Sequence, residues 1–165
     1  MYNAPASHLA ALLGIDGASY TLVGVASVGL AAMKFAEQLL DTGDLAQVVV
    51  VGSEEIDWVV CAAYGDWRLA RSTPEGRGAL LAEGAAAVVL ARAGRMKVAA
   101  QHDGVSVFRR TEAVRAVDRV FADLGAADVV IGSANGTYVD RAERAAIARH
   151  CPAAVAYFPA PAPRR

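Results

Sequence analysis

The sequence has few cysteines and few charges, and each shortage argues against a class of protein. Its two cysteines, Cys61 and Cys151, lie far apart without a CxxC spacing. That pattern argues against a disulfide framework or a structural zinc site and favours a reducing compartment. Only 20% of the residues are charged and no block of like charges occurs, so nothing favours nucleic acid as a partner.

Targeting and membrane signals are also missing. The N-terminus lacks the basic and apolar regions of a secretory signal peptide. An uncharged run over residues 17–33 is just short of a transmembrane helix and is interrupted by glycines and hydroxyl residues. We therefore expect a cytoplasmic protein without a membrane span.

Hydrophobic residues, by contrast, are abundant. They make up 55% of the 165 residues, and alanine and valine supply most of them. Such a chain can bury a sizeable core, and it is not of the disordered type. The excess of apolar residues predicts a subunit that buries part of its surface in a partner.

The periodicity alternates between strand and helix, which predicts an α/β fold with a mostly parallel sheet and layered helices. The run "QVVVVGS" is typical of a central parallel strand. We expect a hairpin across Gly94, between residues 79–93 and 95–108. The other expected helices cover residues 5–13, 27–40, 55–70, 111–125 and 140–150, and the other expected strands cover residues 19–23, 128–133 and 153–158.

Four short motifs occur in order along the chain. "TLVGVASVG" at residues 21–29 has the strand–turn–helix form of a nucleophile elbow. It is followed by "GDLAQVVVVGSEE", by "LLAEGAAAVVL", and by "DVVIGSANGTYVDRAERAAI". In this order and spacing the motifs resemble the β-ketoacyl synthase family, whose members have the thiolase-like fold.

The resemblance implies a division of the chain. Residues 1–108 would be an N-terminal ketosynthase-like lobe that holds the elbow, and residues 109–158 the start of a C-terminal lobe. Residues 159–165 would be a proline-rich tail. We expect a middle slice of a synthase, without the segments that carry the family's second histidine and a glycine-rich oxyanion loop.

The residues at the reactive positions differ from those of the family. Val25 stands where the family has its acyl-accepting cysteine, and valine cannot form the thioester intermediate. Ser133 and Asn135 occupy the loop that carries the family's first histidine, and neither titrates near neutral pH. No catalytic residue, metal or cofactor is therefore expected.

Two other kinds of residue, a serine and the histidines, are possible replacements for the missing groups. Ser27 follows the elbow by two positions, but a helix-start residue needs no catalytic role and no histidine lies near it in sequence. His8, His102 and His150 lack a metal-ligand spacing. Cys61 is expected to be a buried apolar residue and Cys151 a helix-end residue.

Several motif residues have structural explanations. Asp140 and Glu143 form a pattern like a capping box at the start of a helix. Glu83 lies among apolar strand residues, so we expect it to be hydrogen-bonded. Trp58, Tyr64 and Trp67 could line an acyl channel, but their spacing favours core packing.

Three interpretations remain. The first is a non-catalytic subunit, like a chain-length factor, that supports an active synthase in fatty acid or polyketide biosynthesis. It would form a homodimer or a heterodimer through the strand at residues 18–23, with acyl carrier protein as a further partner. The second is an acyltransferase whose site is completed by another chain. The third is a truncated, inactive copy.

Overall fold

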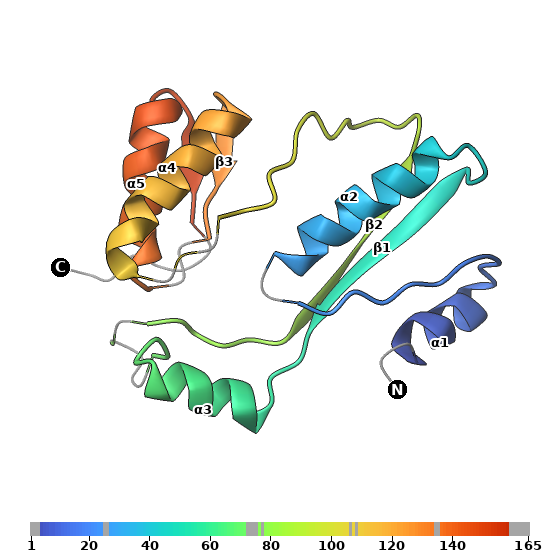
Figure 1. Cartoon of the computed structure of the whole chain (residues 1–165), viewed down its shortest axis with the longest axis horizontal. Coiled ribbons are helices and arrows are strands. Elements are labelled where there is room, and N and C mark those ends of the chain that lie inside the picture. The colour runs from blue at the N-terminus through green and yellow to red at the C-terminus, as the bar shows by residue number, and fades with distance from the viewer. Residues whose placement is uncertain are drawn as a thin grey trace. The chain divides into compact units, whose positions relative to one another are not determined.

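The chain divides into two compact units. The computed structural model describes residues 4–24, 27–71, 76, 78–105, 107, 109–133 and 136–158. One unit comprises Met1–Gly52 and Ala87–Gly94, and the other comprises Ser53–Ala86 and Arg95–Arg165. Figure 1 labels their helices and strands. Within the described ranges, none of the helices combines the length and the apolar character that crossing a bilayer requires.

The first unit is built around one long helix. Helices α1 (Ala4–Leu13) and α2 (Val28–Asp41) precede strand β1 (Gln47–Glu54). Ala36 and Leu40 of α2 are buried, as is Val50 of β1. The guanidinium of Arg92 donates two hydrogen bonds to the Leu40 carbonyl. The same carbonyl accepts from the N–H of Gly43 at 3.2 Å, so Arg92 adds a side-chain contact to the turn that ends α2.

Strand β1 pairs with β2 (Gly84–Ala91) in an antiparallel ribbon, which corrects two predictions. The "QVVVVGS" segment is half of a two-stranded sheet rather than a central parallel strand. Residues 95–105 form no strand, so the expected hairpin across Gly94 is wrong. Figure 1 shows the chain running along β1 and returning along β2. The valines of these two segments favour strand pairing. Residues 95–101 include charged residues and lack a run of β-branched residues, so they do not form the partner strand.

The segment before the elbow is also different from the prediction. Residues 18–24 form no strand, although they are rich in β-formers. Leu22 and Val23 are 40% and 75% exposed, and the ring of Tyr20 meets that of Phe35 edge-on at 5.1 Å. A strand needs a neighbour for its backbone groups, and no strand of the described residues pairs with this segment.

The second unit holds the remaining helices and a parallel strand pair. They are α3 (Trp58–Asp66), a short 3-10 helix (Arg110–Glu112), α4 (Ala113–Leu124), β3 (Val129–Ile131), α5 (Val139–His150) and β4 (Val155–Tyr157). Strand β3 pairs with β4 in parallel. The described residues thus hold one parallel and one antiparallel strand pair, and the expected mostly parallel sheet is not shown.

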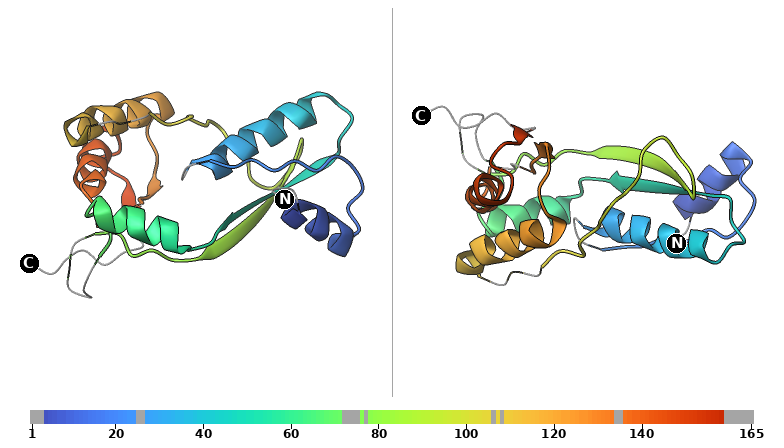
Figure 2. Two further views of the ribbon diagram at one scale, coloured as in Figure 1. Left: turned by 60° about the horizontal axis from the view of Figure 1, so that its bottom comes forward. Right: turned by 90° about the horizontal axis from the view of Figure 1, so that it is seen from above.

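Small residues bring α4 and α5 together. Ala113 and Ala116 of α4 and Ala142 and Ala146 of α5 are all buried, at 9% exposure or less. The two helices pack against each other, as two views show (Figures 1 and 2). Helix α4 ends as predicted at Gly125, whose φ is 81° and whose N–H bonds to the Phe121 carbonyl.

A cluster of three charged side chains holds the same two helices at their surface. The Oδ1 atom of Asp118 on α4 lies 2.7 Å from Nη1 of Arg149 and 2.9 Å from Nε2 of His150, both on α5. The hydrogen bond to His150 is the main cause that lowers the pKa of Asp118 below its ordinary value. Partial desolvation opposes this shift, and the Arg149 charge adds to it.

We expect this cluster to make the stability of the helix pair depend on pH. Because the folded-state pKa of Asp118 is lowered, its ionised form stabilises the fold above about pH 4, and this contribution is lost as the pH falls through the folded-state value. Asp118→Asn should lower the urea midpoint at pH 7, and its difference from the unmodified chain should shrink toward about pH 2. The control is Asp66→Asn, an exposed carboxylate without an ion pair among the described residues. An Asp118→Asn deficit that stays constant with pH would contradict this assignment.

Candidate functional site

The structure describes the residues on either side of the elbow, up to residue 24 and from residue 27 onward. Val25, at the expected nucleophile position, lies outside the described residues. Ser27 directly precedes α2, as predicted, and its carbonyl accepts hydrogen bonds from the N–H groups of Leu30 and Ala31 at 3.0 and 3.1 Å. The Ser27 hydroxyl makes no capping hydrogen bond. The hydrogen bonds of the Ser27 carbonyl therefore account for its position at the helix start.

The loop after β3 is held by carboxylates from α5. The N–H of Ser133 donates to both carboxylate oxygens of Glu143, at 2.9 and 3.1 Å. The Ser133 hydroxyl lies 3.3 Å from each of the same oxygens. Farther along, the N–H of Gly136 donates to Oδ2 of Asp140 at 3.0 Å. Asn135 lies outside the described residues.

These contacts correct the expected capping box. The residue before α5 is Tyr138, and it makes no side-chain capping bond. Asp140 and Glu143 instead project back from the first turns of α5 to the loop that precedes it. A carboxylate at a helix start is favoured by the helix dipole and can also accept from nearby backbone N–H groups. Their role is to fix the loop, and a sequence pattern alone does not distinguish that role from capping.

Close backbone contacts fix the same loop from outside. The N–H of Gly78 donates to the Gly136 carbonyl at 3.0 Å. A Cβ at Gly136 would lie against the carbonyl oxygen of Gly78, and a Cβ at Gly132 would lie 2.5 Å from the Phe158 ring. The guanidinium of Arg144 stacks on that ring, 4.0 Å from its centroid. The loop that should hold a histidine is therefore packed at both ends.

Two histidines, His102 and His150, form hydrogen bonds with carboxylate or backbone groups. Nε2 of His102 lies 3.1 Å from Oδ2 of Asp123 on α4, and its Nδ1 accepts from the N–H of Gly104 at 2.8 Å. His150, on α5, contacts Asp118 on α4. No group of three or more His, Cys, Asp or Glu side chains suited to a metal ion occurs in the part of the chain that is described.

Of the other predictions about single residues, the structure confirms two and shows two to be wrong. Glu83 accepts a hydrogen bond from the N–H of Ile56 at 3.2 Å, which confirms a hydrogen-bonded role. Cys151 is buried at the end of α5, as predicted for a helix-end residue. Cys61 is exposed, so its expected burial is wrong. Core packing of the tryptophans is also wrong, since Trp58 and Trp67 are 80% and 60% exposed.

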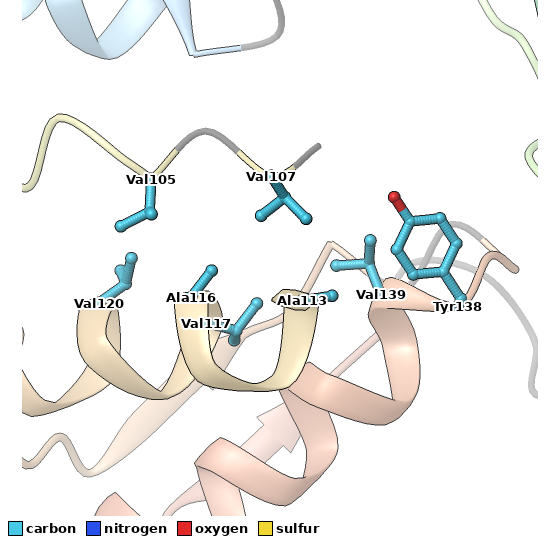
Figure 3. A pocket seen from close by; sticks show the side chains of 8 residues that line it. All are labelled: Val105, Val107, Ala113, Ala116, Val117, Val120, Tyr138 and Val139. Carbon is cyan, nitrogen blue, oxygen red and sulfur yellow. The ribbon is translucent and has the colours of Figure 1, made fainter. Parts of the chain in front are cut away.

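An apolar cavity lies beside α4 among the described residues (Figure 3). Its volume is about 220 Å³, and it lies between Val105 and Val107 on one side and the helix on the other. Its lining consists of Val105, Val107, Ala113, Ala116, Val117, Val120, Tyr138 and Val139. Ligand sites are usually larger and have placed polar groups, and the Tyr138 hydroxyl is the one polar side-chain group in this lining. The cavity is a packing gap rather than a candidate substrate site.

Comparison with known proteins agrees with the elbow motifs. Neither a curated protein nor a solved structure gives a significant match. The sequence model of the family described as "Beta-ketoacyl synthase, N-terminal domain" matches residues 1–95, which is more than half of the chain. The predicted C-terminal lobe lies beyond that match, and the division at residue 108 stays a prediction. The chain thus belongs to the β-ketoacyl synthase family.

Proposed function

We propose that this chain is a non-catalytic β-ketoacyl-synthase-like subunit that supports an active synthase in fatty acid or polyketide biosynthesis. The observation that carries the proposal is Val25 at the nucleophile position of a family member. Condensation in this family passes through an acyl thioester on a cysteine. A valine side chain has no atom that can accept the acyl group.

The loop after β3 supports the same proposal. Ser133 and Asn135 stand in the loop that carries the family's first histidine, and both the N–H and the hydroxyl of Ser133 are directed to Glu143. Glu143 is thereby used to hold the loop. A site without a thiolate and without this imidazole lacks both the nucleophile and one group that would act on the acyl carbonyl.

The surface supports a role as a subunit. Tyr20, Leu22 and Val23 are 53%, 40% and 75% exposed in a segment that forms no strand here. An extended apolar segment of this kind can pair with the sheet edge of a partner. We propose that residues 18–23 become a strand at the seam of a homodimer or a heterodimer with an active synthase. The mostly parallel, layered sheet of the thiolase-like fold would be completed there.

The test is acyl transfer. The chain is incubated with a labelled acyl-CoA or acyl carrier protein, denatured and digested, and the peptide containing residues 25–29 is examined by mass spectrometry. We expect no adduct on that peptide, because the elbow holds no thiolate. An active synthase treated in the same way is the positive control. A stable adduct on Ser27 would overturn the non-catalytic role and identify an oxygen nucleophile.

A further inference from the structure

Part of the apolar face of α4 is covered by the chain segment that precedes it. The covering segment, defined here as residues 102–105 and 107, places Val105 and Val107 opposite the helix (Figure 3). The cavity of about 220 Å³ lies between these valines and α4. Side chains that border a gap lack the contacts that would hold them in place. Apolar packing therefore holds this segment loosely, and its hydrogen bonds contribute more of the attachment.

His102 holds the covering segment through both of its ring nitrogens. Nδ1 lies 2.8 Å from the backbone nitrogen of Gly104, and Nε2 lies 3.1 Å from Oδ2 of Asp123 on α4. The His102 side chain is only 17% exposed. A backbone N–H can only donate, so Nδ1 is an unprotonated acceptor, and Nε2 carries the ring proton and donates it to Asp123. The closed arrangement thus requires neutral His102 in one tautomer.

A second proton on the ring disfavours this closed arrangement. On Nδ1 it would face the Gly104 N–H, so two donors would oppose each other and the hydrogen bond would be lost. Gly104 has a φ of 82°, and as a glycine it has the backbone freedom to turn its N–H to water instead. The contact from Nε2 to Asp123 can persist in both arrangements. The open arrangement therefore binds the proton more tightly, and this difference in affinity lets protons shift the equilibrium.

The charged groups near the ring influence the pH at which the shift occurs. Asp123 contacts the ring from α4, and Asp103 is the next residue in the chain. Both carboxylates favour a positively charged imidazole. Asp118, the other acidic residue of α4, is engaged by side chains of α5. The basic residues of α4, whose charges act in the opposite direction, are Arg115 and Arg119.

We infer that His102 is a pH-sensitive latch, and that acidification from about pH 7.5 to about pH 5.5 frees Val105 and Val107 from α4 and opens the apolar face of this helix. Histidine is the side chain whose ordinary charge change falls in this range. The inference goes beyond the proposed function and does not depend on it, because none of these residues lies at the elbow or in residues 18–23.

NMR spectroscopy of the full chain tests the latch. At pH 7.5 we expect the nitrogen signals of His102 to show a proton on Nε2 and none on Nδ1. Nuclear Overhauser effects should connect the methyl groups of Val105 with those of Val120, which lines the same cavity. At pH 5.5 these effects should lose about half of their intensity or more. The protection of the Gly104 N–H from hydrogen exchange, relative to an unstructured peptide at the same pH, should fall about threefold.

His102→Asn is the variant that does not titrate in this range. Its amide oxygen can accept from the Gly104 N–H and carries no charge at either pH. The Val105 signals should therefore keep their intensity at pH 5.5. His150→Gln is the matched control, because His150 is the other histidine that contacts an aspartate of α4. It should leave the acid response of the covering segment unchanged.

Asp123→Asn gives an independent measurement. Its carboxamide oxygen still accepts from the Nε2–H of His102, but its negative charge is gone. The opening transition should therefore move to lower pH without disappearing.

Three results would overturn the inference. One is a proton on Nδ1 of His102 at pH 7.5. Another is a set of Val105 signals with equal intensity at both pH values. The third is the same loss at pH 5.5 in His102→Asn, since another group would then cause it. Circular dichroism checks that His102→Asn is folded. If it is not folded, Asp123→Asn decides, and an opening transition at the unchanged pH overturns the latch.

Discussion

Gly136→Ala is expected to destabilise the second unit by about 3–5 kcal/mol, one of the largest effects of any single methyl group in this chain. Gly136 has a φ of 82°, where an L side chain is strained by about 1–2 kcal/mol. Its new Cβ would also press on the Gly78 carbonyl, with the carbonyl carbon 2.9 Å away. Backbone cannot rotate away as a flexible side chain can. Urea unfolding of the variant measures the loss.

Gly125→Ala is the matched control. Gly125 has a φ of 81°, and a Cβ there would meet nothing within 4 Å. It should therefore lose only the strain of the backbone conformation, about 1–3 kcal/mol, because a φ of 81° with a ψ of −168° is a conformation that is essentially restricted to glycine. We expect the larger loss for Gly136→Ala, because only there would the new Cβ meet the Gly78 carbonyl. Equal losses would show that this contact does not fix the loop at the position of the family histidine.

Val25→Cys is expected to create the most reactive thiol of the chain without creating a synthase. Position 25 precedes α2, whose first residue is Val28. A thiol near a helix N-terminus has a lowered pKa, because the helix dipole stabilises the thiolate. We expect it to react with iodoacetamide about tenfold faster at pH 7 than the exposed Cys61, as a shift of about one pKa unit would give. Peptide mass spectrometry over time measures each rate.

Val23→Cys is the control for exposure. Val23 is 75% exposed but lies farther from the start of α2, so its thiol should react at an ordinary rate. Carbon–carbon bond formation should be absent from the Val25→Cys chain, because the loop after β3 has Ser133 and Asn135 where the family carries its first histidine. Condensation by this variant alone would show that the missing histidine is not required. Labelling no faster than at Val23→Cys would show that the turn is not an elbow.

Much of the local structure is predictable because it depends on neighbours in sequence. Helices α2, α4 and α5 follow from apolar periodicity, and the stop of α4 follows from Gly125. Strands β1 and β3 follow from short runs of valine and isoleucine, and β4 from the short apolar segment Val155–Tyr157. The predictions that failed concern which segments of the chain pair with each other. Residues 18–24 have strand character but no strand beside them, and residues 84–91 pair with β1 instead of with residues 95–108.

The same distinction applies to the candidate site. The sequence by itself determined the family, the elbow motif, the valine at its apex and the absence of a histidine in the loop, because these depend only on which residue occupies each position. The tertiary structure decided that Glu143 and Asp140 hold the preceding loop, that Gly78 packs on Gly136, and that the tryptophans around α3 face solvent. Hydrogen bonds and exposure are properties of groups brought together from different parts of the chain. A one-dimensional pattern specifies the groups but not which of them meet.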